Sequence, residues 1–290
     1  MVECIIWFGE EMIEIKSRGG LGYGDIIIGM NWAHRIAYST GEKVTLNYLW
    51  QFDDKWKYNI ESDEYLWQQA EYLNSIFSQG YSYEVNIKHT FNDLSRMKFD
   101  RYNDDLIKDW SQHMLWQTKG NFRNMPDKDL IVINDPLSNK ESFETFFDGD
   151  RLWKISGDWN VILKMLYQKY PHKEIVRINY KTPIRRVVDL LSRCEVFIGH
   201  HSGLSWIAHN LSARGILFTR KHDLTKLTFP GFHLVDSGFE LDTIENLEAS
   251  ILKSDQIRKD YQPFFEISMN MPEHIINKGL SWNRYGWHKL

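Results

Sequence analysis

Two histidines, a serine and a glycine stand where an apolar run gives way to a helical pattern. Residues 196–198 are typical of a strand buried on both faces, and His200, His201, Ser202 and Gly203 follow. Ser202 is a favourable N-cap for the helix that comes next. The first backbone N–H groups of a helix have no partner within it, and the helix dipole attracts an anion to them. The sequence therefore predicts a diphosphate-binding turn at Ser202 and Gly203.

The paired histidines allow a metal site as an alternative interpretation. Adjacent side chains on a turn diverge, and no Cys or carboxylate stands at a recognised ligand spacing from His200 and His201. We therefore expect no metal here and expect His201 to donate a hydrogen bond to a phosphate or a sugar. Trp206, one turn into the helix, is either part of the core or a flat face on which a ligand stacks.

A second glycine-rich turn leads to a carboxylate. Glycines occupy positions 19, 20, 22 and 24, and Asp25 stands directly before the helical pattern of residues 26–38. Gly22 and Gly24 would let the backbone turn sharply beside an anion, or they form a tight turn that binds nothing. Asp25 is either a general base, whose pKa is raised by partial desolvation in a cleft, or the cap of the helix.

These turns need a repeated framework of strands and helices to position them. In the first half, the patterns predict strands at 2–8, 12–16, 43–49 and 83–87 and helices at 26–38, 64–77 and 102–117. In the second half, they predict strands at 130–133, 174–178, 196–198, 216–218 and 233–236 and helices at 158–170, 183–193, 203–211 and 241–253. This alternation predicts an α/β fold with parallel sheets. We expect domains at 1–125 and 126–255, with a tail at 256–290 that packs back on the first.

Composition restricts the class of protein. The 290 residues carry a formal net charge of −4, which argues mildly against a broad surface for nucleic acid. Hydrophobic residues make up 42% and charged residues 26%, as in an ordinary soluble globular protein. There are 2 cysteines, far apart, and the first residues resemble neither a signal peptide nor a membrane span. We expect a cytoplasmic protein.

The two glycine turns resemble the motifs of the heptosyltransferase-like branch of the GT-B glycosyltransferases. Residues 22–25, Gly-Tyr-Gly-Asp, match the N-terminal motif, and residues 201–208 match the C-terminal one, Asp-Ser-Gly-x-x-His-x-Ala. The family aspartate is His201 here and the family histidine is Trp206, which leaves the donor open. The resemblance implies a GT-B-like architecture of two Rossmann-like βαβ domains facing across a cleft. It also implies inverting, metal-independent transfer from a nucleotide-diphosphate sugar, with Asp25 as the base.

A looser match concerns the basic residues of the donor site. Arg151 stands before the predicted helix at 158–170, and by the resemblance it would approach the donor diphosphate, with Lys140 as a competitor. The donor-binding residues that we expect are Gly22, Gly24, Lys140, Arg151, His200, His201, Ser202, Gly203 and Trp206. No cofactor is expected, since the nucleotide-diphosphate sugar is a co-substrate.

Several alternatives stay open at the level of sequence. The acceptor would be a saccharide, such as a lipopolysaccharide core, or a hydroxymethylated pyrimidine in phage DNA, within a bacterial or phage-infected cell. A non-catalytic module that binds a nucleotide sugar and a nucleotide-sugar epimerase are the rival functions. Asp148 and Asp150 form the Asp-x-Asp pattern of metal-dependent glycosyltransferases, but a solvated turn is the favoured interpretation of this short motif.

Overall fold

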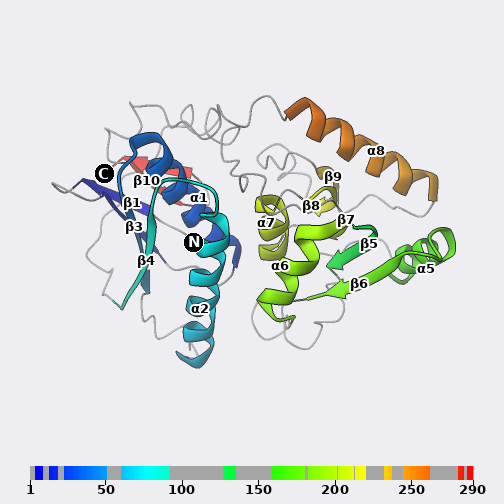
Figure 1. The fold of residues 1–290 in the computed structure, drawn as a ribbon, viewed down its shortest axis with the longest axis horizontal. Coiled ribbons are helices and arrows are strands. Elements are labelled where there is room, and N and C mark those ends of the chain that lie inside the picture. The colour runs from blue at the N-terminus through cyan, green and yellow to red at the C-terminus, as the bar shows by residue number, and fades with distance from the viewer. Residues whose placement is uncertain are drawn as a thin grey trace. The chain divides into compact units, whose positions relative to one another are not determined.

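The structure, a computed structural model, describes residues 4–8, 13–18, 23–50, 60–91, 127–134, 159–179, 182–200, 202–211, 213–219, 232–236, 244–261, 280–283 and 286–289. The chain divides into two compact units, each built on its own sheet (Figure 1). Unit 1 comprises Met1–Asn121 and Phe264–Leu290, and unit 2 comprises Phe122–Pro263. Both sheets contain parallel strands connected by helices, so the predicted α/β class is confirmed.

Unit 1 contains a mixed six-stranded sheet with the strand order β11-β10-β1-β2-β3-β4. Its elements are β1 (Cys4–Phe8), β2 (Ile13–Arg18), α1 (Tyr23–Thr40), β3 (Val44–Trp50), α2 (Ile60–Phe77), β4 (Val85–Phe91), β10 (Leu280–Asn283) and β11 (Gly286–Lys289). The first two strands pair antiparallel. Strands β2, β3 and β4 are parallel, and α1 and α2 connect them in two successive βαβ units.

Hydrophobic spacing explains why α1 and α2 fold against this sheet. Ile26, Met30 and Ala37 recur at helical intervals on α1 and are buried against the parallel strands. On α2, Ala70 and Phe77 lie on the buried side, as their spacing predicts. The parallel half of unit 1 thus has one helical layer in which α1 and α2 contact each other.

Unit 2 is a five-stranded, fully parallel sheet with the strand order β6-β5-β7-β8-β9. Its elements are β5 (Asp127–Asn134), α5 (Trp159–Lys169), β6 (Glu174–Ile178), α6 (Ile184–Arg193), β7 (Cys194–His200), α7 (Gly203–Asn210), β8 (Gly215–Thr219), β9 (Phe232–Asp236) and α8 (Ile244–Tyr261). Helix α6 packs on α7 (Figure 1), and α5 contacts α8. Because right-handed crossovers in opposite directions place their helices on opposite faces, this is a doubly wound sheet.

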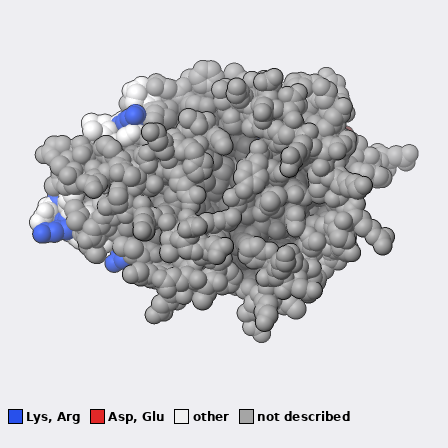
Figure 2. Space-filling model, turned by 180° about the vertical axis from the view of Figure 1, so that it is seen from behind, with Lys and Arg blue, Asp and Glu red and all other residues white. Residues whose placement is uncertain are grey.

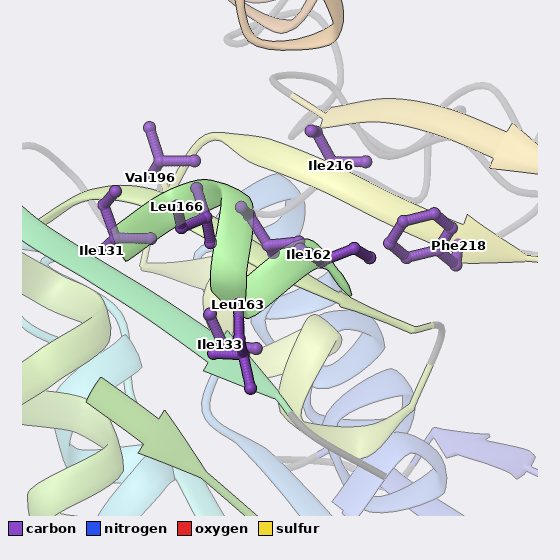
Figure 3. Close-up of a cluster of buried hydrophobic side chains, with 9 residues drawn as sticks. Ile131, Ile133, Ile162, Leu163, Leu166, Val196, Ile216 and Phe218 are labelled. Carbon is purple, nitrogen blue, oxygen red and sulfur yellow. The ribbon is translucent and has the colours of Figure 1, made fainter. Parts of the chain in front are cut away.

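The core of unit 2 lies between α5 and the sheet (Figure 3). It is formed by aliphatic residues of three adjacent strands and one aromatic residue, packed against the apolar side of the helix. The cluster comprises Ile131, Ile133, Val196, Ile198, Ile216 and Phe218 from the strands and Ile162, Leu163 and Leu166 from α5. The strand runs are nearly continuous in apolar residues because both faces of the sheet are covered by helices.

Three regions differ from the sequence patterns or extend them. The predicted helix at 102–117 lies outside the described residues. Helix α8 continues to Tyr261 rather than ending at 253, because no Gly or Pro interrupts the chain before Pro263. In the C-terminal segment, β10 joins the sheet of unit 1, with Cys4 paired to Trp282.

Among the described helices, none combines the length and the apolar character needed to cross a membrane.

Candidate functional site at the ends of strands β5 and β7

The strand order of unit 2 creates a switch point between β5 and β7. From β5 the chain passes to β6 on one side, and it then returns to β7 on the other side of β5. The connections from β5 and β7 leave in opposite directions, and in open α/β sheets ligands bind beyond the carboxyl ends of the strands at such a switch point. Asn134 ends β5, His200 ends β7, and α7 begins at Gly203 just beyond.

Helix α7 begins in a well-formed cap. Ser202 and Ser205 form a capping box in which the backbone N–H of Ser202 donates to Ser205 Oγ at 3.0 Å. The predicted N-cap position of Ser202 is therefore confirmed. The backbone N–H groups of Gly203 and Leu204 have no hydrogen-bond partner among the described residues. They are two donors at the positive end of the helix dipole.

Asn134 connects the two strands of the site, although no sequence pattern predicted it. Its side-chain amide nitrogen donates to Ser202 Oγ at 3.0 Å and lies 3.3 Å from His200 Nδ1. The side chain is only 2% exposed. A polar residue directly after the apolar run of residues 130–133 was the available signal, because the carboxyl ends of parallel strands meet at one edge of the sheet.

Gly199 allows this close approach of β5 to β7. A Cβ atom at position 199 would lie 2.9 Å from Cβ of Asn134 and 2.8 Å from Cζ of Phe197, both closer than van der Waals contact permits. The sequence pattern predicted a strand at 196–198 that ends before Gly199. That interpretation is wrong, because β7 continues to His200 and the glycine instead makes room for Asn134.

His200 is a neutral residue at physiological pH. It is 5% exposed, and its burial lowers the pKa of the imidazole from 6.5 to about 4, because the charged ring would lose its hydration. A hydrogen bond from the ring to the backbone carbonyl of Asn134 favours the charged form and raises the pKa, without outweighing burial. The side chain therefore contributes a hydrogen bond to the site rather than a positive charge.

Three of the predicted donor-binding residues, His200, Ser202 and Gly203, lie together at the switch point with Asn134. Trp206 lies on α7 but is 6% exposed and packs edge to face on His209, with the ring centroids 6.4 Å apart. Little of its face is thus left for a ligand. Four predicted residues lie outside the described residues: Gly22, Lys140, Arg151 and His201.

The remaining predicted residues belong to unit 1. Helix α1 begins at Tyr23, so Gly24 and Asp25 lie inside its first turn, and the predicted helix start at residue 26 is wrong. Asp25 accordingly does not occupy the capping position before the helix; its side chain is outside the described part. The buried Tyr48 of β3 donates its hydroxyl to the carbonyl oxygen of Ile26, which fixes the first turn of α1 against the sheet.

Neither a cluster of metal ligands nor a similar protein of known function adds to the description of this site. Within the described ranges, no three side chains of His, Cys, Asp or Glu lie close enough together to hold a metal ion. No model of a known protein family matches the chain, and no curated protein matches it significantly in sequence.

Proposed function

We propose that this protein is a glycosyltransferase that moves a sugar from a nucleotide-diphosphate sugar to an acceptor hydroxyl. The observation that carries the proposal is the set of donors at the switch point of unit 2. The N–H groups of Gly203 and Leu204 begin α7 beside Ser202 and His200, at the carboxyl ends of β5 and β7. Such a position suits a diphosphate in open α/β folds.

The chemistry of transfer makes two demands on the protein. The leaving nucleoside diphosphate develops negative charge, which neutral N–H donors at a helix start stabilise without a metal ion. For inversion, a base must remove the proton of the acceptor hydroxyl as the bond to the sugar forms. In the proposal Asp25, in the first turn of α1, is this base, and the two units form a GT-B-like pair around one sugar diphosphate.

Two classes of acceptor fit this chemistry, a saccharide and a hydroxymethylated pyrimidine in DNA. The net charge of −4 gives no general attraction for DNA. On the face seen in Figure 2, the visible Lys and Arg side chains of described residues lie scattered along one edge and form no broad patch. We therefore propose a saccharide acceptor first and test DNA as the second.

The decisive experiment starts with a thermal-shift screen across nucleoside diphosphates and their sugars, because a ligand that binds only the native state raises the melting temperature. The best donor is then incubated with candidate glycans and hydroxymethylated DNA. Asp25→Asn should retain donor binding but lose at least a hundredfold in transfer rate. Asp189→Asn is the matched control, because this carboxylate is half exposed on α6 and should leave transfer unchanged.

Other outcomes would support the rival functions. Binding of a nucleotide sugar without transfer to any acceptor would favour a non-catalytic binding module. Conversion of the donor into an isomer in the absence of acceptor would favour an epimerase. Full transfer activity in Asp25→Asn would show that the base is another residue.

A further inference from the structure

We propose that helix α8 detaches reversibly from the sheet of unit 2 and that ionic strength sets how often it does so. The chain passes from unit 2 to unit 1 between Pro263 and Phe264, shortly after α8 ends at Tyr261. Detachment would therefore add residues 244–261 to the connection between the two units. The inference goes beyond the glycosyltransferase proposal and does not depend on it.

The side of α8 that contacts the sheet is polar in the middle of the helix. Ser250 and Ser254 lie one turn apart and are 4% and 1% exposed, whereas Leu252 is 69% exposed. Ile251 packs in part against the core cluster, and it is the one large apolar side chain of residues 248–256 that does so. Burying a serine contributes little hydrophobic free energy, so this part of α8 depends on its polar contacts.

A hydrogen bond and an ion pair join α8 to the start of β8. The backbone N–H of Gly215 donates to Ser254 Oγ at 2.9 Å. Directly before β8, Arg214 forms an ion pair with Asp255 of α8. The Nε of the same guanidinium donates to the carbonyl oxygen of Glu195 in β7 at 3.0 Å, so Arg214 links the helix to the sheet.

A second ion pair, between Lys169 of α5 and Glu248, lies nearer the N-terminus of α8. Both pairs are accessible to solvent: the exposed side-chain fractions are 28% for Arg214, 27% for Asp255, 27% for Lys169 and 45% for Glu248. Mobile ions weaken the attraction between such partly exposed charges. Added salt should therefore weaken two of these three contacts and leave the hydrogen bond of Ser254 intact.

Helices α5 and α6 are attached to the same sheet in a different way. On α5, Ile162 and Leu166 belong to the core cluster, and on α6, Val187 and Leu191 are fully buried. Salt does not screen apolar contacts. Helix α6 also carries ion pairs, from Asp189 to two arginines, but both partners lie on α6 itself and do not attach it to the sheet. This helix is therefore the internal control for α8.

Hydrogen exchange of the 290-residue chain at constant pH tests the proposal. Between about 0.05 M and about 0.5 M NaCl, the amides of α8 should exchange about threefold to tenfold faster, whereas those of α6 should not change. Equal exchange of α8 at the two salt concentrations would overturn the proposal. A rise that is the same in α8, α6 and β7 would also overturn it, because unit 2 would then open as a whole.

Substitutions assign the salt effect to the ion pairs. Asp255→Asn should speed the exchange of α8 about threefold at low salt, and together with Glu248→Gln it should abolish the salt dependence. Asp189→Asn on α6 should leave α8 unchanged. Ser254→Ala should speed the exchange of α8 about fivefold at both salt concentrations and keep their ratio, since a neutral hydrogen bond is not screened. A salt dependence that persists in full without both carboxylates would contradict the assignment.

Discussion

The buried imidazole of His200 should make unit 2 sensitive to acid, and the effect has a defined direction. Folding lowers its pKa from 6.5 to about 4, so the unfolded chain binds this proton more tightly than the native one. The stability contributed by the neutral ring is therefore complete above pH 6.5 and is lost as the pH falls from 6.5 toward 4.

The size of the loss follows from the same two values. One pKa unit corresponds to about 1.4 kcal/mol, so lowering the pH from 7 to 4 should cost unit 2 about 3 kcal/mol through His200 alone. Such a loss is a large fraction of the stability of an ordinary domain. His233, which is partly exposed on β9, also has a lowered pKa and adds to the acid sensitivity of the wild type.

A comparison of the wild type with His200→Gln isolates the contribution of this ring. The free energy of unfolding is measured in urea at pH 7, 5 and 4 by hydrogen exchange of peptides that cover β7 and α7. Between pH 7 and pH 4, the wild type should lose about 3 kcal/mol more than the variant. Parallel losses in the two proteins would show that His200 is not held neutral by burial, and the reasoning about its hydrogen bonds would then fail as well.

Three further predictions concern the stability of the two units. Gly215→Ala should destabilise unit 2 by about 4 kcal/mol or more in urea titrations, because φ of Gly215 is +153° and a Cβ there would lie 1.7 Å from a carbonyl oxygen of β7. Gly41→Ala, where φ is +71° but the surrounding space is open, should cost unit 1 only about 1 kcal/mol. Equal losses of stability in the two variants would refute the steric argument. The buried N–H of Gly215 donates to Ser254 Oγ at 2.9 Å, so Ser254→Ala removes the acceptor of this hydrogen bond. The substitution should cost unit 2 about 1–3 kcal/mol in urea titrations. An unchanged midpoint of urea unfolding would show that the hydrogen bond does not stabilise unit 2. Lys43→Ala breaks an exposed pair with Glu84 at 2.9 Å and should leave the melting temperature unchanged within error, whereas a clear drop would show that the pair stabilises unit 1.

The alternation of strands and helices could be predicted because its signals are local. Runs such as residues 130–133 and 216–218 are apolar at consecutive positions, and the helices between them repeat apolar residues at helical spacing. The Ser202 cap was also readable, since a serine before an apolar helical pattern is a local signal.

Other features depend on partners far away in the sequence. The insertion of β5 between β6 and β7 is set by strand pairing across the sheet, which no local pattern encodes. Asn134 was missed because the apolar periodicity ends one residue before it, and its role arises from contacts with residues 66 and 68 positions later. The early start of α1 was missed because Gly24 is a poor helix former, while the contact from Tyr48 to Ile26 holds that turn.

The central claim is that the start of α7 receives the diphosphate of a nucleotide sugar. Backbone amide shifts of ¹⁵N-labelled protein, recorded while each common nucleoside diphosphate is added, test it most directly. The account predicts that at least one of them binds and that the largest shifts occur at the amides of Gly203 and Leu204. Binding that leaves these two amides unmoved, or no binding by any nucleoside diphosphate, would contradict it.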